Sequence, residues 1–459
     1  MSMIQELVAA QNDFFAEQWS RDVQFRKRFL RLLEKEIVAQ EDAICHALYA
    51  DFKKPRFESL ATETQLVLAE IRHAIKNIGS WSRPVPVASP WTSFPSREWI
   101  QREPYGKVLI ISPWNYPFML AIMPLIGALA AGNTAVLKPS EHVPNTSKAI
   151  ASIIENVFPP EYVSVVEGGV GVSTVLLAQK WEYIFFTGST QVGKIVYQRA
   201  AEQLCPVTLE LGGKNPCIVD ESANIPLSAK RITWGKFLNA GQTCIAPDYI
   251  LVHKNAKEAL IGALKEQIHK FYGEEIEKTK DFARIATLKQ YEGLKEMLQG
   301  QTILLGGDHN DEDRFLGPTL VDEPARGSSL MAGEIFGPIL PILAYETKKD
   351  LDRHIKGHGD PLALYVFSKS RSFQKWAMDR YPFGGGAIND TVVQITNNRL
   401  PFGGTGPSGI GSYHGEHSHE LFSHKKSIVK RATWLDVPLR YAPYRIPLGW
   451  VKRFKYLFR

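Results

Sequence analysis

The chain has 459 residues, of which 44% are apolar, 22% charged and 11% aromatic. This ordinary globular composition excludes a disordered, collagen-like or disulfide-rich protein, and the length suits two or three structural units with ample core. Four scattered cysteines without a Cys-x-x-Cys pair argue against a disulfide framework and a zinc site, and they favour a reducing compartment.

The net charge of +6 is concentrated at the C-terminal end, where residues 431–459 hold seven basic residues and one acidic residue. The first 430 residues are therefore neutral overall, which removes the main support for a nucleic-acid-binding role.

The chain contains one uncharged run that is long enough to suggest a membrane span. Residues 108–137 carry no formal charge, and about 20 apolar residues suffice to cross a bilayer. Prolines and asparagines interrupt the run, so we expect buried core of a soluble protein instead. The first 20 residues lack a long apolar stretch and do not resemble a secretory signal, which favours the cytoplasm.

Apolar residues at helical spacing predict helices over residues 3–80, and the Pro- and Trp-rich stretch 81–104 suits an extended arm. Short buried-type strands then alternate with helical patterns, which predicts a parallel, doubly wound sheet. The expected strands are 107–112, 134–137, 163–166 and 183–186. A second α/β stretch runs from 211 to about 396, with strands such as 249–252 and 364–367.

A glycine turn follows the strand at 183–186 and opens a helix. Gly188, Ser189 and Gly193 there leave backbone N–H groups free to face an anion such as a pyrophosphate. The spacing matches neither a Gly-x-Gly-x-x-Gly fingerprint nor a phosphate loop, so a simple helix-capping turn is an equal alternative.

Three residues have settings that suggest chemistry. Cys244 ends a loop of small residues, whereas Cys45, Cys205 and Cys217 have no such setting; an inert core thiol is the alternative. Glu210 and Glu334 lie among apolar residues, where burial raises a carboxyl pKa toward the range useful for a general base. Each glutamate taken singly also fits a structural hydrogen bond to loop backbone.

Taken together, these segments resemble the aldehyde dehydrogenase superfamily, and most closely its class 3 branch, which acts on fatty and aromatic aldehydes. Eight motifs occur in the family's order and cover nearly the whole chain up to about residue 430. They are Ile-Ser-Pro-Trp-Asn-Tyr-Pro-Phe (111–118), Leu-Lys-Pro-Ser-Glu (137–141), Phe-Thr-Gly-Ser-Thr (186–190), Leu-Glu-Leu-Gly-Gly-Lys (209–214), Gly-Gln-Thr-Cys (241–244), Glu-Ile-Phe-Gly-Pro (334–338), Leu-Pro-Phe-Gly-Gly (400–404) and Phe-Ser-His-Lys (422–425).

The resemblance implies an NAD(P)-dependent oxidation of aldehydes to carboxylic acids, an activity of EC 1.2.1 type. Cys244 matches the nucleophile that forms a thiohemiacetal and then a thioester, and Glu210 matches the general base. The amide of Asn115 and the backbone N–H of Cys244 match the donors that hold the oxyanion. The resemblance leaves open how Glu210 and Glu334 divide the general-base work.

The likeness also implies the cofactor residues. Gly188, Ser189 and Gly193 match the turn at the pyrophosphate, and Lys138 and Glu141 match contacts to the adenosine ribose. A carboxylate at 141 favours NAD over NADP, although the branch often accepts both. The nicotinamide end is implied to contact Trp114, Glu334, Phe336 and Phe402. Tyr116 and Trp234 suggest an aromatic substrate entrance, with ordinary core packing as the alternative.

The expected fold has a Rossmann-like cofactor domain (1–80 and 100–210), an α/β catalytic domain (211–396), a β-type oligomerisation arm (81–99 and 397–430) and a basic, aromatic tail (431–459). Relatives of class 3 imply a homodimer. Acyl-transfer or esterase activity from the same thiol, or a non-catalytic binding protein on this fold, are the alternatives.

Two features depart from the family pattern or extend beyond it. His419 stands where the family usually has an aromatic residue, close to His414, His417 and His424; no thiol or carboxylate spacing completes a metal site, so packing histidines are expected. Residues 448–459 suit a short, basic amphipathic helix that lies on an anionic bilayer, that is, a peripheral contact at the inner membrane surface; docking on the protein or its partner subunit is the equal alternative.

Overall fold

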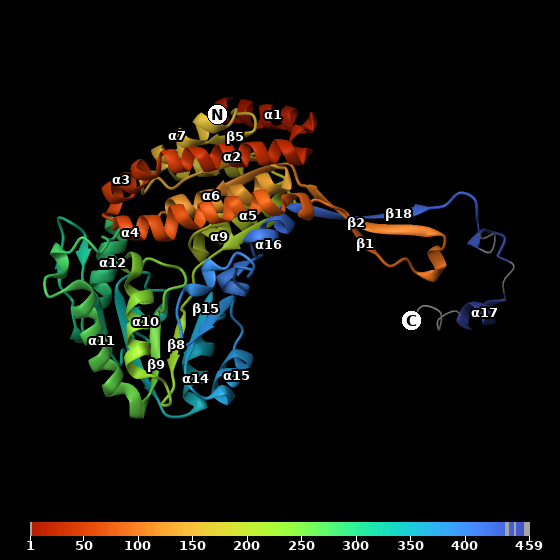
Figure 1. Ribbon diagram of the computed structural model, residues 1–459. Helices are drawn as coiled ribbons and strands as arrows, with labels where there is room; N and C mark the ends of the chain where they lie inside the picture. The colour runs from red at the N-terminus through yellow and green to blue at the C-terminus, as the bar shows by residue number, and fades with distance from the viewer. Residues whose placement is uncertain (1, 437–439, 445–446, 454–459) are drawn as a thin grey trace.

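Two α/β layers form the body of the chain, and a small antiparallel sheet extends from it as an arm (Figure 1). The computed structural model describes residues 2–436, 440–444 and 447–453. The chain builds the first layer up to about residue 210 and the second layer from about residue 216, and it then returns to the first.

The first sheet has six strands in the order β17-β7-β6-β3-β4-β5, all parallel except β17. Its central strands are buried along their whole length, as expected when helices cover both faces. The bounds are β3 (Lys107–Ile111), β4 (Thr134–Lys138), β5 (Val163–Val165), β6 (Tyr183–Thr187), β7 (Val207–Glu210) and β17 (Gly409–Ile410).

Helices from the N-terminal region and from the crossovers cover this sheet. The N-terminal set contains α1 (Ser2–Ala16), α2 (Val23–Ala39), α3 (Glu41–Phe52), α4 (Arg56–Ser59), the π-helical turn η2 (Leu60–Thr64) and α5 (Gln65–Trp81). The crossovers contain α6 (Pro117–Ala131), α7 (Pro144–Val157), α8 (Val170–Leu177) and α9 (Thr190–Glu202).

The uncharged run 108–137 is β3, α6 and β4, and every residue of α6 is buried. Pro117 stands in the first turn, where a missing N–H costs nothing, and Gly132 ends the helix with a φ of 102°. The expectation of buried core is confirmed. Within the described ranges, the structure contains no helix of the length and apolarity that a membrane crossing requires.

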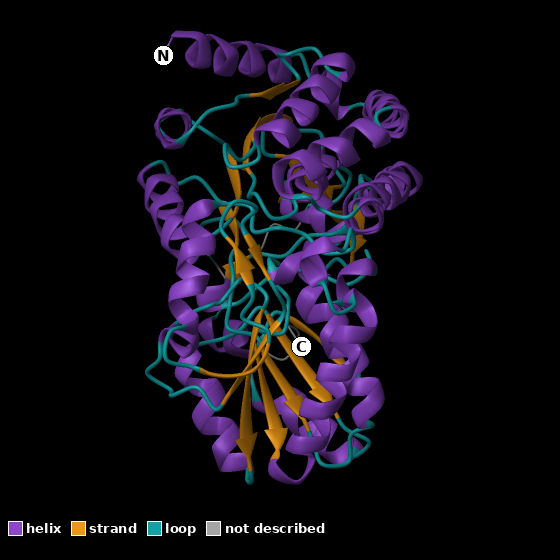
Figure 2. Ribbon diagram, turned by 90° about the vertical axis from the view of Figure 1, so that its left-hand side faces the viewer, coloured by secondary structure: helices purple, strands orange, loops and turns teal. Residues whose placement is uncertain are grey.

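The second sheet has seven strands in the order β10-β13-β14-β9-β8-β15-β16, all parallel except β10, and its strands fan out between helices in Figure 2. The bounds are β8 (Pro216–Val219), β9 (Tyr249–His253), β10 (Thr302–Leu305), β13 (Thr319–Asp322), β14 (Ile339–Tyr345), β15 (Ala363–Phe367) and β16 (Gly385–Ile388). The helices of this layer are α10 (Ile225–Phe237), α11 (Lys257–Tyr272), α12 (Leu288–Leu298), α13 (Ser329–Ala332), α14 (Lys348–Ile355) and α15 (Arg371–Arg380).

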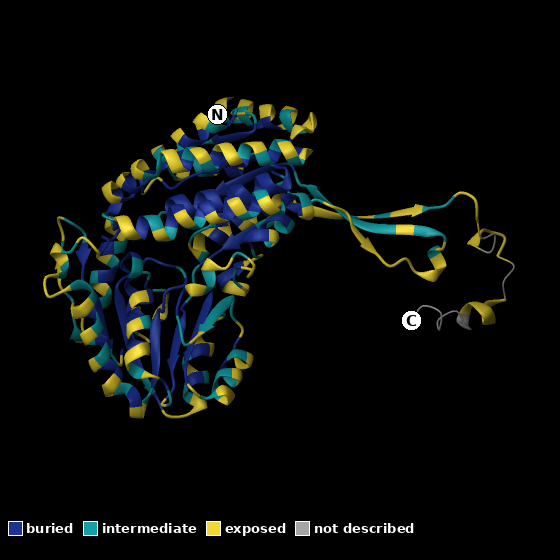
Figure 3. Cartoon of the chain, in the orientation of Figure 1, coloured by how far each residue is buried: buried dark blue, intermediate teal, exposed yellow. Residues whose placement is uncertain are grey.

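The arm consists of β1 (Val85–Val87), β2 (Ser96–Pro104) and β18 (Ser423–Arg431). β2 and β18 pair over nine residues, from Ser423 opposite Pro104 to Arg431 opposite Ser96. Beyond its base, few side chains of the arm are buried (Figure 3), in contrast to the body.

The stretch 397–430, which we assigned to the arm, divides in the structure. β17 pairs with β7 of the first sheet, and α16 (Gly415–Leu421) packs on α5 and α6, so these segments lie on the body. Only β18 enters the arm. The reason is the Gly-rich turn at 409–415, whose positive φ angles let the chain cross the end of the first sheet.

Beyond β18 the chain continues away from the body, and the short helix α17 (Leu448–Arg453) lies past the end of the arm (Figure 1). The helix that we expect over 448–459 therefore begins where expected, and its residues 454–459 lie outside the described residues. Trp434, Tyr444 and Trp450 in this region are exposed.

Candidate active site

The predicted catalytic residues come from the segments that join the two layers. Glu210 is the last residue of β7, and Cys244 lies in the loop between α10 and β9. Carboxyl ends of parallel strands are where α/β proteins bind ligands, because loops and helix N-termini converge there. The active site is therefore expected at the boundary between the two layers.

Cys244 is held by a loop with an unusual backbone. Asn239, Ala240 and Gly241 all have positive φ angles, of 55°, 52° and 74°. A Cβ at Gly241 would lie 2.3 Å from the carbonyl oxygen of Gly337, so this close approach requires glycine. Cys244 is half-buried, whereas the other three cysteines are buried, and all four are free.

Two amide side chains fix this loop. Gln242 donates from Nε2 to the carbonyls of Asn239 and Arg284, both at 3.0 Å, and its Oε1 accepts from the N–H of Ala286 at 2.9 Å. Asn215 donates to the carbonyl of Cys244 at 2.7 Å. Neither amide is in the predicted site. Gln242 belongs to the Gly-Gln-Thr-Cys motif, and this position could have identified it as part of the site. Nothing in the sequence identifies Asn215 in the same way.

The Cys244 thiol is neutral in this setting. Burial raises its pKa well above the ordinary value, and the charges of Glu334 and Glu210 act in the same direction. The backbone N–H groups of Cys244 and Ile245 oppose this by hydrogen-bonding the thiolate. A thiol of this kind needs a base to become a nucleophile.

Glu210 is buried, and both of its carboxyl oxygens are without a hydrogen-bond partner within the described part of the chain. Burial raises its pKa well above the usual range. Its backbone is held on both sides, by Thr187 of β6 and Gly409 of β17. The side chain is therefore placed rigidly while its acid group is left unpaired, an arrangement that suits proton transfer.

Glu334 lies over a glycine cradle. A Cβ at Gly212 would lie 1.8 Å from Glu334 Oε2, and the N–H of Gly213 hydrogen-bonds the carboxylate. Burial, with the charge of Asp248, raises its pKa to about 8. The carboxyl can therefore be charged or neutral near neutral pH.

A buried ion pair supports the loop that carries Glu334. Lys214 donates to Asp248 at 2.6 Å and to the carbonyls of Leu330 and Gly333 at 2.6 and 2.8 Å. Asp248 in turn accepts from the N–H of Ile335 at 3.0 Å. Lys214 ends the Leu-Glu-Leu-Gly-Gly-Lys motif (209–214), but nothing in the sequence indicates that Asp248 is its partner.

Asn115 is buried at the turn before α6. Its Nδ2 donates to the carbonyl of Gln242 at 3.0 Å, and its own carbonyl accepts from Asn239 Nδ2 at 2.9 Å. The amide thus contacts the loop that ends in Cys244. The neighbouring Tyr116 is also buried, and its hydroxyl lies 2.7 Å from Thr243 Oγ1. Trp234, the other residue of the predicted entrance, is exposed on α10.

The glycine turn lies at the N-terminus of α9. Ser189 caps the helix by accepting from the N–H of Val192. A Cβ at Gly188 would lie 2.6 Å from the Phe186 ring, and one at Gly193 would lie 2.6 Å from the Leu211 side chain, so both positions require a small residue. The helix start carries partial positive charge and suits a pyrophosphate.

Lys138 and Glu141 form an ion pair at 2.5 Å at the end of β4. Burial opposes ionisation of Glu141, but the hydrogen bond from Lys138, with smaller contributions, lowers the pKa of Glu141 below its usual value. This carboxylate is charged and exposed, and it can accept a hydrogen bond from a ribose hydroxyl. The turn, the ion pair and the Glu334 cradle together fit a dinucleotide.

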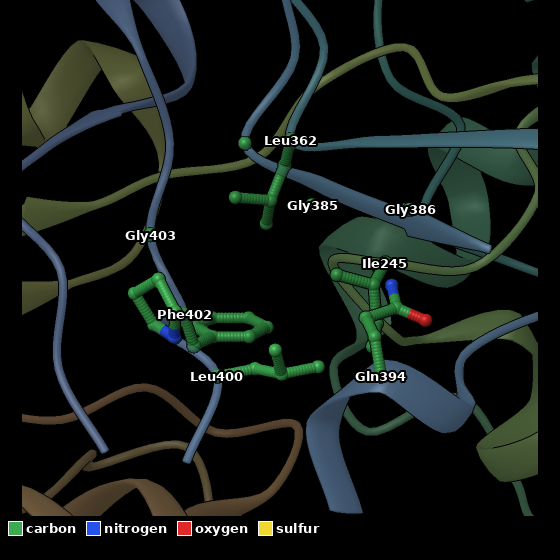
Figure 4. A pocket seen from close by; sticks show the side chains of 10 residues that line it. Ile245, Leu362, Gly385, Gly386, Gln394, Leu400, Phe402 and Gly403 are labelled. Carbon is green, nitrogen blue, oxygen red and sulfur yellow. The ribbon is translucent and has the colours of Figure 1, made fainter. Parts of the chain in front are cut away.

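Aromatic rings line the region between the layers. Trp114 and Phe336 meet edge to face, with centroids 5.3 Å apart, and Phe336 has a φ of 53°. Phe402 stacks on His414 with centroids 5.2 Å apart. Phe402, Leu400, Leu362 and Ile245 line a mainly apolar cavity of about 260 Å³ (Figure 4). Because Ile245 follows Cys244, this cavity lies next to the loop that carries the thiol.

The clustered histidines serve as packing groups. His414 and His419 are buried, and burial lowers the pKa of each to about 3. His419 packs on Trp81 with centroids 5.8 Å apart. In the part of the chain that the structure describes, no three side chains of His, Cys, Asp or Glu are grouped to hold a metal ion.

Comparison with known proteins identifies this architecture. The family model described as "Aldehyde dehydrogenase family" matches residues 2–428. The chain belongs to the aldehyde dehydrogenase family and is an aldehyde dehydrogenase of EC 1.2.1 type that uses NAD(P). The predicted family and fold are confirmed, and the alternative of a non-catalytic binding protein is wrong.

Its relatives include several members of family 3. The chain is 44% identical to the 4,4'-diaponeurosporen-aldehyde dehydrogenase of Staphylococcus aureus, over 99% of both chains. It is 44% identical to the aldehyde dehydrogenase family 3 comG of Dictyostelium discoideum, over 94% of this chain and 92% of the relative. The solved structure described as the substrate-bound state of Staphylococcus aureus AldH superposes with a TM-score of 0.97 at 44% identity, covering 99% of this chain and 100% of the other.

Proposed function

We propose that this aldehyde dehydrogenase oxidises medium- to long-chain aliphatic or aromatic aldehydes to carboxylic acids, with Cys244 as the nucleophile. The observation that carries the proposal is the setting of the Cys244 thiol. It is half-buried in a rigid loop whose next residue, Ile245, lines an apolar cavity, and the charges of Glu334 and Glu210, two carboxyls with raised pKa values, act on it.

In the proposed reaction the Cys244 sulfur attacks the aldehyde carbon while its proton passes to a carboxyl base. The resulting thiohemiacetal oxygen is held by the Asn115 amide and the N–H of Cys244; removal of such a donor typically costs about 10²–10³ in rate. NAD(P)⁺, held as described below, would supply the hydride acceptor, so that the thiohemiacetal on Cys244 would be oxidised to a thioester. Water then cleaves the thioester and releases the acid.

Glu210 is the proposed general base for the thiol and for the hydrolytic water. Its unpaired carboxyl oxygens support this role, since a water molecule or a thiol can donate a hydrogen bond to them. Glu334, with its glycine cradle, is proposed to hold the nicotinamide ribose, and Trp114, Phe336 and Phe402 to pack near the ring. At the adenosine end, Lys138 and Glu141 are proposed to bind the ribose.

We further propose that NAD is preferred over NADP, because the Glu141 carboxylate repels a 2′-phosphate. Among the relatives, the dimeric dehydrogenase of Canis lupus familiaris is described as NADP-preferring, at 38% identity over 96% of this chain and 98% of the relative. The ratio of kcat/KM for the two cofactors tests the preference.

The substrate class rests on the apolar cavity and on the relatives. The Staphylococcus aureus relative is named for a diaponeurosporen aldehyde, and the apolar lining of the cavity supports an apolar substrate here. The test is a panel from acetaldehyde to hexadecanal and benzaldehyde, with NADH absorbance as the readout. A kcat/KM that rises with chain length supports the proposal, and highest efficiency with acetaldehyde contradicts it.

We also propose a cytoplasmic homodimer that contacts the inner membrane surface through residues 448–459. The exposed aromatic residues after β18 and the basic sequence of the tail support this contact. Deletion of 448–459 should reduce sedimentation with phosphatidylglycerol vesicles and leave sedimentation with phosphatidylcholine vesicles unchanged. Equal sedimentation of the full-length and the truncated protein with phosphatidylglycerol vesicles would discard the membrane contact and favour docking on the partner subunit.

A further inference from the structure

A buried group of charged residues lies behind the Cys244 loop, on the helices of the N-terminal region. Lys54 follows α3, Glu58 lies on α4 and Glu63 lies on the π-helical turn η2. Lys54 Nζ donates to Glu63 Oε1 at 2.7 Å, and both side chains are fully buried. Because apolar residues fill such a space at equal or greater stability, a buried ion pair calls for another explanation.

Glu63 holds the start of α6. Its Oε2 accepts from the N–H groups of Phe118 and Met119 at 3.0 and 2.9 Å. The N-cap residue of α6, Tyr116, makes no side-chain cap of its own. A carboxylate at this position satisfies two free N–H groups and complements the helix dipole. The orientation of the preceding turn, which carries Asn115, therefore depends on Glu63.

Glu58 holds the start of the Cys244 loop. Its Oε2 accepts from the N–H of Asn239 at 2.9 Å, at the first of the three residues with positive φ. Non-glycine residues in this conformation cost of order 1 kcal/mol or more and persist only where their surroundings hold them. The side chain of Asn239 then donates to the carbonyl of Asn115 at 2.9 Å.

Lys54 connects these two supports. Its ammonium lies 3.8 Å from the centroid of the Tyr116 ring and attracts the charges of Glu63 and Glu58. The hydroxyl of Tyr116 lies 2.7 Å from Thr243 Oγ1, one residue before the nucleophile. One ammonium group thus contacts a chain of residues that ends at Asn115 on one side and at Cys244 on the other.

We propose that Lys54, Glu63 and Glu58 are positioning residues that set the Asn115 amide against the Cys244 thiol, so that the oxyanion forms within reach of its donor. The inference rests on the proposed function, because it assumes that Cys244 is acylated. Displacement of a reacting group by about 1 Å can cost roughly 100-fold in rate, so a rigid connection between the two segments has a direct kinetic value.

The test separates two reactions of the same sulfur. With 4-nitrophenyl acetate, the Cys244 thiolate forms a C–S bond at the ester carbonyl through an oxyanion, and 4-nitrophenolate leaves. With iodoacetamide, the thiolate displaces iodide at a saturated carbon, and no oxyanion forms. Only the first reaction needs the Asn115 amide.

The variant is Lys54→Met combined with Glu63→Gln, which removes both charges and keeps an oxygen to cap α6. We expect cofactor-free acylation to fall about tenfold or more while alkylation stays within about twofold of wild type. In an Asn115→Ala background the same pair of changes should have less than about a twofold effect on acylation, because the donor that it positions is already absent. Additive losses in that background would overturn the proposal.

Asp51→Asn is the matched control. Asp51 is a buried carboxyl that accepts from the N–H groups of Asn145 and Thr146 and so caps α7, as Glu63 caps α6. It has no contact with the Cys244 loop among the described hydrogen bonds, so its change should lower the melting temperature and leave the acylation-to-alkylation ratio unchanged.

Tyr116→Phe keeps the test decisive if the double variant does not fold, since it removes only the hydroxyl that contacts Thr243. We expect acylation to fall about threefold, again only when Asn115 is present, and wild-type acylation in Tyr116→Phe overturns the proposal. If the wild-type protein itself shows no acylation at Cys244, the proposed function fails, which is a different result from acylation that persists at full rate in the variants.

Discussion

Two buried acidic regions flank the Cys244 loop, and they differ in how their carboxyls are paired. In the region of η2, Glu63 has a lysine and two backbone N–H groups as partners. At the end of β7, Glu210 is equally buried, and its carboxyl oxygens have no hydrogen-bond partner among residues 2–436, 440–444 and 447–453. A buried polar group without partners costs about 1–3 kcal/mol, and more when it is charged.

The difference in pairing separates carboxyls that hold the structure in place from carboxyls that are free to react. A carboxylate that is fully paired cannot take up a proton without breaking its partners' bonds, so it fixes geometry. A carboxyl that is unpaired destabilises the fold, but its oxygens are available to a thiol or a water molecule. The unpaired carboxyl of Glu210 therefore suits the catalytic role that we propose for it, and the fully paired carboxylate of Glu63 suits the proposed positioning role.

The contrast between Glu63 and Glu210 depends on Cys244, and it fails if the Cys244 thiol is not the nucleophile. Replacement Cys244→Ala should lower aldehyde oxidation by about 10⁴-fold or more, as expected when a covalent nucleophile is lost. The melting temperature should change by no more than a few degrees, because the side chain is only half-buried. NADH formation and thermal unfolding measure the two quantities, and normal turnover in this variant contradicts the assigned chemistry.

The comparison becomes sharper when each glutamate is changed to glutamine. Glu210→Gln should reduce kcat by about 10²–10⁴-fold and should leave the free energy of unfolding equal or higher, because an unpaired acid is removed. Glu63→Gln should instead lower it by about 3–5 kcal/mol, since the Lys54 ammonium remains buried without its partner. Chemical denaturation measures both changes. Equal destabilisation by the two variants would remove the distinction.

The pH dependence of stability tests the protonation states of three other buried carboxyls without mutation. Burial raises the folded-state pKa of Glu58, and of the buried Glu70 on α5, to about 7 and that of Glu334 to about 8, above the ordinary value near 4.5. Their contribution is complete below the unfolded-state pKa and is lost as the pH rises through the folded-state values. For each carboxyl the free energy of unfolding should fall by about 1.4 kcal/mol per pH unit between the unfolded-state pKa and the folded-state pKa, that is, up to about pH 7 for Glu58 and Glu70 and up to about pH 8 for Glu334, and it should level off above that value.

The buried histidines set the acid side of this profile. Burial lowers the pKa of His414 and of His419 to about 3, so their contribution is present above about pH 6.5 and is lost as the pH falls toward the folded-state values. Melting temperatures from pH 5 to 9 should therefore decline above neutrality. A melting temperature that keeps rising to pH 9 contradicts the assigned protonation states.

Glu141 is an intermediate case, an exposed carboxylate that is paired with Lys138. Glu141→Gln removes the charge that repels a 2′-phosphate, so the ratio of kcat/KM for NADP to that for NAD should rise about tenfold. Steady-state kinetics with both cofactors measures this ratio. A strong NADP preference in the wild-type protein would overturn the assignment of Glu141.

Local pattern was sufficient for much of the architecture. The apolar, β-branched strands of both sheets and the Pro-bounded helix α6 have the spacing that their burial demands. The positions of Cys244, Glu210 and Glu334 in apolar or small-residue segments also marked them as candidates.

The supports of the site could not be found in this way. Lys54, in Phe-Lys-Lys-Pro, has the sequence of an exposed loop residue, and its burial depends on Tyr116 and Glu63, which the fold brings together. Ala240 carries no local signal for a left-handed backbone, because its conformation is imposed by the hydrogen bonds around it. Likewise, the pairing of β17 with β7 joins residues about 200 positions apart, beyond any periodicity.

The pairing of β17 with β7 affects how the first sheet forms during synthesis on the ribosome. The first sheet has all of its other strands once residue 210 has emerged, but the strand that covers the outer side of β7 is synthesised last of the six. At about 5–20 residues per second, translation needs roughly 10–40 s to reach it. During that interval β7 is an open edge of the first sheet, and an open edge is a template for pairing with another chain.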